Sequence, residues 1–188
     1  MRSSMYLFCG LTGSGKSTLA SKFAKENGLA YLDYDTIVQP FLSEIEKRYG
    51  IGPSRAQFYI SWREECYKSL WDTCAQILSN GASLAVSAPC GKEIEDPTFF
   101  ATLKAKAGVD FNAVGIYLAP EKDFHFKVMK QRNAIWNDDI IPNWESYCKT
   151  HRPHRPVWDA DRNIYIEYSG FDQLDQKFRD AMDGRVND

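Results

Sequence analysis

The chain has 188 residues, of which 44% are apolar and 14% aromatic, so it can bury the core of one domain, which we expect to span residues 1–188. The formal net charge of −2 excludes a broad basic surface, and nucleic acid is therefore not an expected partner. The five cysteines are scattered without a CxxC pair, and no run approaches the ~20 apolar residues of a membrane span, which favours a reduced, cytoplasmic protein without membrane contact.

The first predicted elements are a strand, a glycine-rich turn and a helix. Residues 5–9 (MYLFC) form a short apolar run that ends at Gly10, which is typical of a strand buried on both faces. In segment 16–27 pairs of apolar residues are four positions apart, as in a helix, and Gly28 closes the segment. Residues 29–35 (LAYLDYD) predict a second strand.

The remaining sequence continues the alternation of helices and strands. A helix is predicted over 36–49, and a long helical segment follows over 54–79, with an apolar residue at every fourth position. Because a strict four-residue spacing drifts around a helix, we expect this segment to bend or to make contacts on two sides. The later elements are a strand at 83–89, a helix at 94–107, a strand at 110–120, helices at 121–136 and 143–149, a strand at 163–169 and a helix at 171–182. This order predicts an α/β fold in which helices cover both faces of a parallel sheet.

The turn between the first strand and the first helix matches the pattern G-x-x-x-x-G-K-[ST] without exception. The predicted nucleotide-binding residues are Gly10, Leu11, Thr12, Gly13, Ser14, Gly15, Lys16, Ser17 and Thr18. Glycines let backbone N–H groups turn inward around a polyphosphate, at the positive end of the helix dipole. Lys16 then reaches the outer phosphates, and the Ser17 hydroxyl is a ligand for Mg²⁺. The alternative is an ordinary glycine-rich turn, but the strand before it and the helix after it favour a nucleotide site.

Two aspartates stand at the end of the second predicted strand. In a parallel sheet the carboxyl ends of the strands lie on the side of the phosphate loop, and alternation puts Asp33 and Asp35 on one face of the strand. A carboxylate in this place can accept the proton of an attacking hydroxyl. The alternative is that Asp35 merely caps the next helix, and the two roles are compatible.

Four stretches of the sequence together resemble one group of enzymes: GLTGSGKSTLA at 10–20, YLDYDTI at 31–37, NGASLAVSAP at 80–89 and VGIYLAPEKDFHFKVMKQR at 114–132. They are similar to the small P-loop kinases related to shikimate and gluconate kinases, chloramphenicol phosphotransferase, polynucleotide kinase and zeta toxin, a group with AAA_33-type ATP-binding proteins among its members. The resemblance implies a three-layer P-loop NTPase sandwich, with a five-stranded parallel sheet in the order 2-3-1-4-5 and a helical lid.

The resemblance also implies roles for individual residues. It implies ATP as the phosphate donor, and a residue at the position of Asp35 that binds or deprotonates the acceptor hydroxyl. The lid region falls at about residues 121–150. Its helix carries Arg132 at the position of the arginine that closes over the phosphates, with Lys127 and Lys130 as weaker candidates.

Further candidates for substrate contacts lie at the start of the long helix and in a late basic stretch. Arg55 and Arg63 stand where this group forms its acceptor pocket, although aromatic residues at helical spacing around them are typical of a core as well. In the stretch 150–162, Arg152, Arg155 or Trp158 is a candidate contact for nucleotide phosphate or base. The alternative for this stretch is a solvated loop.

Two departures from the group's pattern bear on turnover. Trp136 stands where relatives often have a second lid arginine, which predicts slow transfer unless an arginine of segment 150–162 takes that place. The third strand ends with the sequence Ser87-Ala88-Pro89. Many P-loop enzymes have an aspartate near the metal at this place. Mg²⁺ would then be held by Ser17, phosphates and water, and Asp33 would contact these ligands without touching the metal itself.

The leading hypothesis is a Mg²⁺-dependent kinase that moves the γ-phosphoryl group of ATP to a hydroxyl of a small-molecule acceptor. Lys16, Asp35 and Arg132 would be its catalytic side chains, and Asp33, Asp35, Arg55 and Arg63 would contact the acceptor. One alternative is a nucleotide-binding switch or a slow ATPase, which the two departures favour. Another is a kinase of the zeta-toxin or end-processing kind, and the net acidity weighs against long nucleic acids as its substrate.

Overall fold

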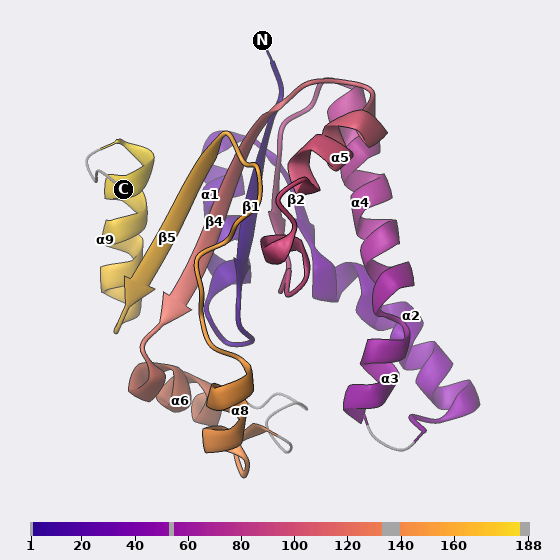
Figure 1. The fold of residues 1–188 in the computed structure, drawn as a ribbon, viewed down its shortest axis with the longest axis vertical. Coiled ribbons are helices and arrows are strands. Elements are labelled where there is room, and N and C mark those ends of the chain that lie inside the picture. The colour runs from indigo at the N-terminus through magenta and orange to yellow at the C-terminus, as the bar shows by residue number, and fades with distance from the viewer. Residues whose placement is uncertain (1, 53–54, 133–139, 185–188) are drawn as a thin grey trace.

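The computed structural model describes residues 2–52, 55–132 and 140–184, with the side chains of residues 55 and 56 left out. Its centre is a five-stranded, wholly parallel sheet in the order β2-β3-β1-β4-β5 (Figure 1). The strands are β1 (Ser4–Gly10), β2 (Ala30–Asp33), β3 (Leu84–Ser87), β4 (Asn112–Pro120) and β5 (Arg162–Tyr168). This confirms the predicted fold class and the predicted strand order.

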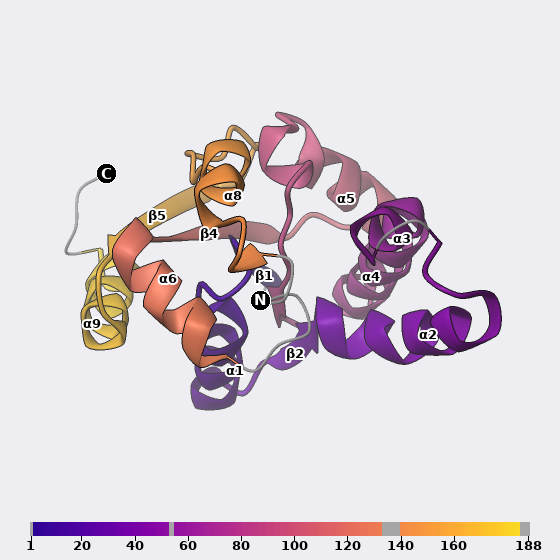
Figure 2. The same ribbon diagram turned by 90° about the horizontal axis from the view of Figure 1, so that it is seen from below.

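Helices pack on both faces of the sheet and around the carboxyl ends of its strands (Figures 1 and 2). The described helices are α1 (Lys16–Asn27), α2 (Tyr34–Tyr49), α3 (Arg55–Ser61), α4 (Arg63–Ser79), α5 (Phe99–Ala107), α6 (Lys122–Gln131), α8 (Trp144–Thr150) and α9 (Phe171–Met182), with a short 3₁₀ turn, η1 (Glu93–Glu95). Helices α1 and α9 cover one face, whereas α4 and α5 cover the other. Seen along the strands in Figure 2, α6 and α8 stand opposite α2 and α3 across the end of the sheet.

Alternate side chains of β1 point to opposite faces of the sheet and are buried in two separate cores. Leu7 and Cys9 point toward α4 and α5, whereas Phe8 points toward α1 and α9, and all three are fully buried. The Phe8 ring lies 5.8 Å from that of Phe23 in α1 and 5.6 Å from that of Phe178 in α9, measured between centroids. Each such buried side chain stabilises the fold by about 1.5–3 kcal/mol. The central strand is therefore held by packing on both of its faces. The loop that follows it starts from a rigid strand.

Two predicted helices are interrupted, and local chemistry explains each break. The segment expected at 54–79 divides at Trp62, which has a turn conformation, into α3 and α4, so the predicted bend is confirmed. The helix expected at 94–107 was wrong in its first part, because Pro97 disfavours a helical conformation at Asp96, which is extended. Residues 93–95 form the short turn η1 instead, and α5 begins only at Phe99.

None of the helices in the described part of the chain is both long and apolar enough to cross a membrane. The helix expected at 121–136 is described up to Gln131, and Arg132 already has an extended backbone at its end. Trp136, which departs from the pattern of the kinase group, lies outside the described residues.

Candidate functional site

The turn after β1 is built around glycines in a left-handed backbone conformation. Gly13 and Gly15 have φ angles of +81° and +75°, which favour residues without a side chain. A Cβ atom on Gly13 would also lie 2.6 Å from the Met129 sulfur. Gly15 is the N-cap of α1 and has no side chain to accept its first N–H groups. Those amides are therefore available to an anion, at the positive end of the helix.

Lys16 lies beside this turn, largely buried. Its Nζ atom is 3.4 Å from the carbonyl oxygen of Leu11, so the side chain folds back over the loop. Burial lowers the pKa of Lys16, and the nearby carboxylate of Asp35 opposes that shift. A polyphosphate bound on the loop would add negative charge next to the ammonium group and hold it in its charged form.

A chain of hydroxyl and carboxylate groups connects the start of α1 with the ends of β2 and β3. The Ser87 hydroxyl donates a hydrogen bond to Asp33 Oδ2 at 2.5 Å, and its Oγ atom is 3.3 Å from Ser17 Oγ. Tyr31 Oη also contacts Ser87 Oγ, at 3.1 Å. An aspartate carboxylate therefore does reach the neighbourhood of Ser17, from β2 instead of β3.

The chemistry of this group of atoms would fit Mg²⁺. Its donors are hard oxygens, which Mg²⁺ prefers, and Mg²⁺ usually keeps several waters and substrate oxygens. Among the described residues there is no cluster of three or more His, Cys, Asp or Glu side chains that would hold a metal by itself. Ser17 would thus be the direct protein ligand, with Asp33 behind it through Ser87.

The two aspartates have different places from those expected. Strand β2 ends at Asp33, and Asp35 lies in the first turn of α2, so the two do not share a strand face. The helix cap expected at Asp35 belongs to Asp33, whose Oδ1 accepts the backbone N–H of Thr36 at 2.9 Å. Burial would raise the pKa of Asp33, but hydrogen bonds from Ser87 and Thr36 bring the pKa below its usual value.

Asp35 reaches the phosphate loop from the helix. It lines the same cleft as Lys16, and the positive charges of Lys16 and Arg132 both act on its carboxylate. Burial raises the pKa of Asp35 above its usual value in spite of these charges. General bases are often partly buried carboxylates whose pKa is raised.

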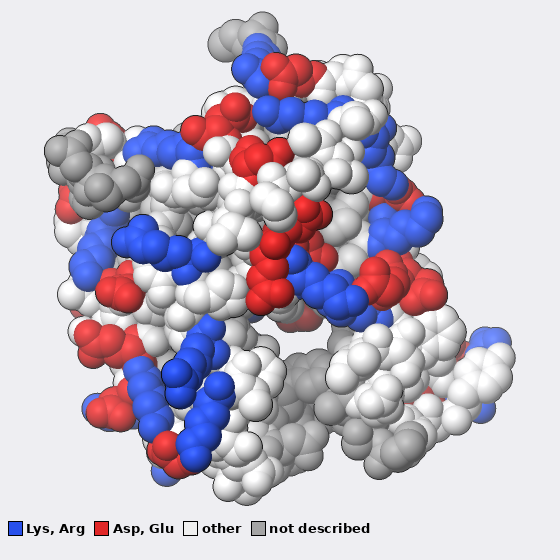
Figure 3. Space-filling view, in the orientation of Figure 1, with Lys and Arg blue, Asp and Glu red and all other residues white. Residues whose placement is uncertain are grey.

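The cleft has a volume of about 770 Å³ and is open at the carboxyl end of the sheet. Figure 3 shows the surface hollowed below the sheet, between the lobe that carries α6 and α8 and the lobe that carries α2 and α3. The phosphate loop forms its floor, Val128, Gln131 and Arg132 of the α6 region form one side, and residues of α2, α3 and α4 form the other. A nucleotide and a second small molecule fit in such a volume.

Helix α6 packs directly on the phosphate loop. The Nε2 atom of buried His125 is 2.6 Å from the Thr12 carbonyl oxygen, and Met129 packs against Gly13. Burial lowers the pKa of His125, so its neutral form is favoured. Neutral His125 then donates a hydrogen bond to Thr12 and fixes the loop. Sequence reasoning missed this contact, because 113 residues separate its two partners.

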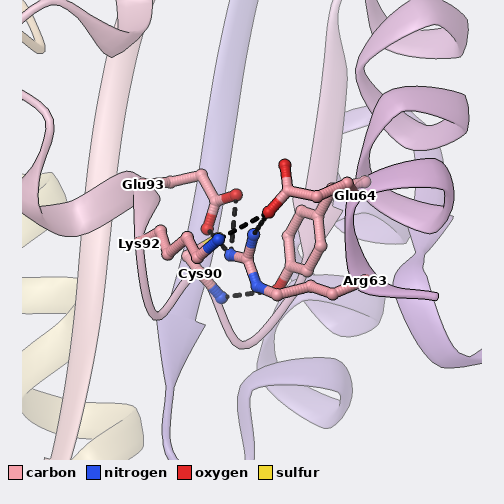
Figure 4. Close-up of polar contacts among 6 residues, drawn as sticks. Arg63, Glu64, Cys90, Lys92 and Glu93 are labelled. Carbon is pink, nitrogen blue, oxygen red and sulfur yellow. Dashed lines mark hydrogen bonds and ion pairs between the residues drawn. The ribbon is translucent and has the colours of Figure 1, made fainter. Parts of the chain in front are cut away.

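The remaining cationic candidates have different surroundings. Arg132 lines the cleft at the end of α6, whereas Lys130 lies over the Phe126 ring, 4.4 Å from its centroid. Arg63 lines the cleft too, and its guanidinium group pairs with the Glu93 carboxylate (Figure 4). The backbone of Arg55 begins α3, but its side chain lies outside what is described.

One of the candidates in segment 150–162, Trp158, needs correction. Trp158 is 3% exposed, packs against Gly115 in β4 and donates a hydrogen bond to Asn163, so it is a core residue and is not free to stack on a base. Arg155 lies over the Tyr165 ring, 5.0 Å from its centroid. The exposed aromatic residue of the cleft is instead Phe171 at the start of α9, which lies beside Gly15.

Comparisons with known proteins agree with this geometry. A family model described as an AAA domain (AAA_33) matches residues 5–138. A Chloroflexus aurantiacus protein thought to be a kinase has a similar structure, with a TM-score of 0.66 and 16% identity over 99% of this chain and 100% of its own. A sugar kinase from a Janibacter species has a TM-score of 0.58 and 16% identity over 95% and 94% of the two chains. The APS kinase of Mycobacterium tuberculosis, solved with AMPPNP and APS, has a TM-score of 0.53 and 21% identity over 97% and 98%. No curated protein matches the sequence significantly.

Proposed function

Because the chain belongs to the AAA domain family, whose model covers residues 5–138, and has the fold of small P-loop kinases, we propose that it is a Mg²⁺-dependent kinase. It transfers the γ-phosphoryl group of ATP to a hydroxyl group of a small molecule. Phosphoryl transfer needs little covalent chemistry from the protein, and its rate depends on positioning and on neutralising charge. The proposal therefore assigns each group in the cleft one of these two tasks.

The phosphate loop and the lid hold the donor. Backbone amides of the loop and the first turn of α1 bind the β- and γ-phosphates, and Lys16 neutralises charge on their oxygens. The Ser17 hydroxyl would hold Mg²⁺, which would supply further neutralisation of phosphate charge. Arg132, which lines the cleft from the end of α6, closes over the γ-phosphate during transfer.

Asp35 acts on the acceptor. It lies on the acceptor side of the cleft, next to the positive charge of Lys16, where it orients the hydroxyl and accepts its proton as the oxygen attacks phosphorus. Its raised pKa makes it a better proton acceptor than an ordinary aspartate. The single observation that carries the proposal is that Lys16 and Asp35 line one cleft, which has a volume of about 770 Å³.

The base of the donor has a candidate partner as well. Phe171 is 48% exposed and lines the cleft beside Gly15. A planar base gains stacking energy on an exposed aromatic ring, about 1–3 kcal/mol per base. We assign this ring to the adenine of ATP.

The test is ADP release in the presence of a panel of hydroxyl compounds. A kinase releases ADP at a rate that depends on the acceptor, and the stimulation disappears in a Lys16→Ala variant. Release that is indifferent to every compound would instead support the nucleotide switch or slow ATPase. Stimulation by oligonucleotide ends alone would support an end-processing kinase.

A further inference from the structure

The acceptor side of the cleft is lined mainly by aromatic and aliphatic side chains. We call these residues the acceptor wall: Tyr34, Val38, Tyr59, Ile60, Arg63 and Tyr67. The Tyr34 and Tyr67 rings are 4.6 Å apart between centroids, with an angle of 31° between their planes. Such a surface suits the flat, apolar face of a ring compound.

The positive charge of Arg63, the one cation among the described residues of the acceptor wall, is neutralised within the protein. Its Nη2 atom donates to both carboxylate oxygens of Glu93, at 2.9 and 2.7 Å, and its Cζ atom lies 4.2 Å from the centroid of the Tyr67 ring. The side chains of Arg63 and Glu93 are only 20% and 9% exposed. Ion pairs that are shielded from water in this way hold their partners firmly.

A second pair of charges completes the group, as Figure 4 shows. Glu64 lies 3.4 Å from Arg63 and 2.6 Å from the Lys92 ammonium group. Two cations thus face two carboxylates, and the group as a whole is neutral. The carboxylate of Asp35 lines the same cleft next to the acceptor wall, on the side of Lys16.

This distribution of charge disfavours an acidic acceptor. A carboxylate or phosphate on the acceptor would be buried next to Asp35 without a free cation on the described wall, which like-charge repulsion and desolvation both oppose. Its attraction to Arg63 would be weakened, because the charge of Arg63 is already balanced by the nearly buried Glu93 carboxylate. An uncharged hydroxyl compound meets neither obstacle.

We propose that the acceptor is an uncharged ring compound with hydroxyl groups, a sugar or a nucleoside, and that Glu93 sets this preference by neutralising Arg63. The proposal rests on the kinase function proposed above. Glu93 acts through Arg63 and is a specificity-determining residue, whereas Asp35 remains the group that acts on the hydroxyl.

The experiment compares acceptors that differ by the charge of one carboxylate: glucuronamide with glucuronate, and uridine with orotidine. The wild-type protein should phosphorylate the neutral member of a pair with a kcat/KM about tenfold or more above that of the acid. In Glu93→Gln, Arg63 keeps its charge without a carboxylate partner there, so the ratio should move toward the acid by about tenfold. Glu95→Gln, an exposed change in the same 3₁₀ turn, is the matched control and should leave the ratio unchanged.

Different failures overturn different statements. A wild-type preference for glucuronate or orotidine overturns the neutral-acceptor proposal and leaves the kinase function standing. An unchanged ratio in a Glu93→Gln protein that still melts cooperatively and binds AMPPNP overturns the role of Glu93. If that variant does not fold, the wild-type ratio still decides the acceptor class. Phosphorylation of no compound at all, neutral or acidic, contradicts the kinase function and the proposal that rests on it.

Discussion

Asp35 combines two properties that usually oppose each other, a partly buried position and, in the proposed reaction, a negative charge. Its burial raises its pKa, and Lys16 only partly offsets this effect. The charged form of Asp35 therefore lowers the stability of the fold. In the proposed reaction this charge is needed, because it accepts a proton. Such a conflict between stability and chemistry is common at functional sites.

Replacing Asp35 with Asn separates these two effects. Transfer to the acceptor should fall by about 10²–10⁴-fold, because the proton acceptor is lost, while the affinity for AMPPNP stays nearly the same. The folded pKa of Asp35 is raised, so the fold loses stability as the pH rises from the unfolded pKa to the folded one. At pH 7 the neutral Asn should therefore leave the melting temperature equal or higher. Equal losses of nucleotide binding and of transfer would remove Asp35 from the mechanism.

The same pKa shift predicts how activity depends on pH. Because Asp35 must be charged to accept a proton, kcat should fall as the pH is lowered through its folded pKa, which lies above the usual value of 3.8. The acid limb of the pH profile should thus appear at a higher pH than an ordinary aspartate would give. The measurement is kcat against pH at saturating ATP and acceptor. The residual activity of Asp35→Asn should lack this limb, and a variant profile with the wild-type limb would assign it to another group.

At the residue scale, the sequence predicts the donor site better than the acceptor site. Lys16 and Ser17 follow from a contiguous pattern, because the loop is formed by neighbours in the chain. The function assigned to Asp35 stays a prediction, and the reason given for its position was wrong, since it projects from a helix and not from a strand. Phe171 and His125 left no local signal, because each meets the loop only after the chain has folded.

Among the secondary-structure elements, the contact of α6 with the phosphate loop stands out. His125 and Met129, one turn apart on α6, contact Thr12 and Gly13. The helix that carries Arg132 is therefore anchored to the loop by its middle turns, while its end lines the cleft. Movements of the lid that bring Arg132 toward a phosphate would be transmitted to the loop.

Gly13→Ala tests this contact. The alanine would have to adopt an unfavourable left-handed backbone conformation, and its Cβ atom would lie 2.6 Å from the Met129 sulfur. We therefore expect the free energy of unfolding to fall by about 1–3 kcal/mol. The affinity for AMPPNP should fall with it. Gly28→Ala is the matched control, because Gly28 has a similar φ of +63° but open space around it. It should lose stability by about 1–2 kcal/mol and bind AMPPNP normally. Calorimetric titration and thermal melting measure both quantities, and normal binding by Gly13→Ala would contradict the account.

The element boundaries show why sequence patterns stop short. The succession of strands along the chain follows from apolar runs and glycine turns, whereas the order of the strands in the sheet was implied by the resemblance to small P-loop kinases, and both are confirmed. The predicted strand at 29–35 was two residues too long at its end, because the Asp33 side chain caps α2 and ends β2 there. A capping hydrogen bond of this kind depends on one side-chain rotamer, which periodicity does not reveal.

For the whole molecule, the sheet places two sources of binding residues on opposite sides of one cleft. The loop, α1 and α6 contribute backbone amides, Lys16 and Arg132, whereas α2, α3 and α4 contribute Asp35 and the acceptor wall. This division suits an enzyme that binds two different substrates and transfers a group from one to the other at the end of β1. The family resemblance in the sequence already implied this architecture. The Arg63–Glu93 ion pair was not predicted, because it forms only when α4 and η1 come together in the folded chain.

The transfer of label from ATP carrying ³²P in its γ-phosphate is the most direct measurement of the central claim. With Mg²⁺ and a neutral hydroxyl compound that stimulates ADP release, the account predicts that the label appears in an organic phosphate ester, in proportion to the ADP formed. Label that appears only as inorganic phosphate, with or without the acceptor, would contradict it and identify the protein as an ATPase.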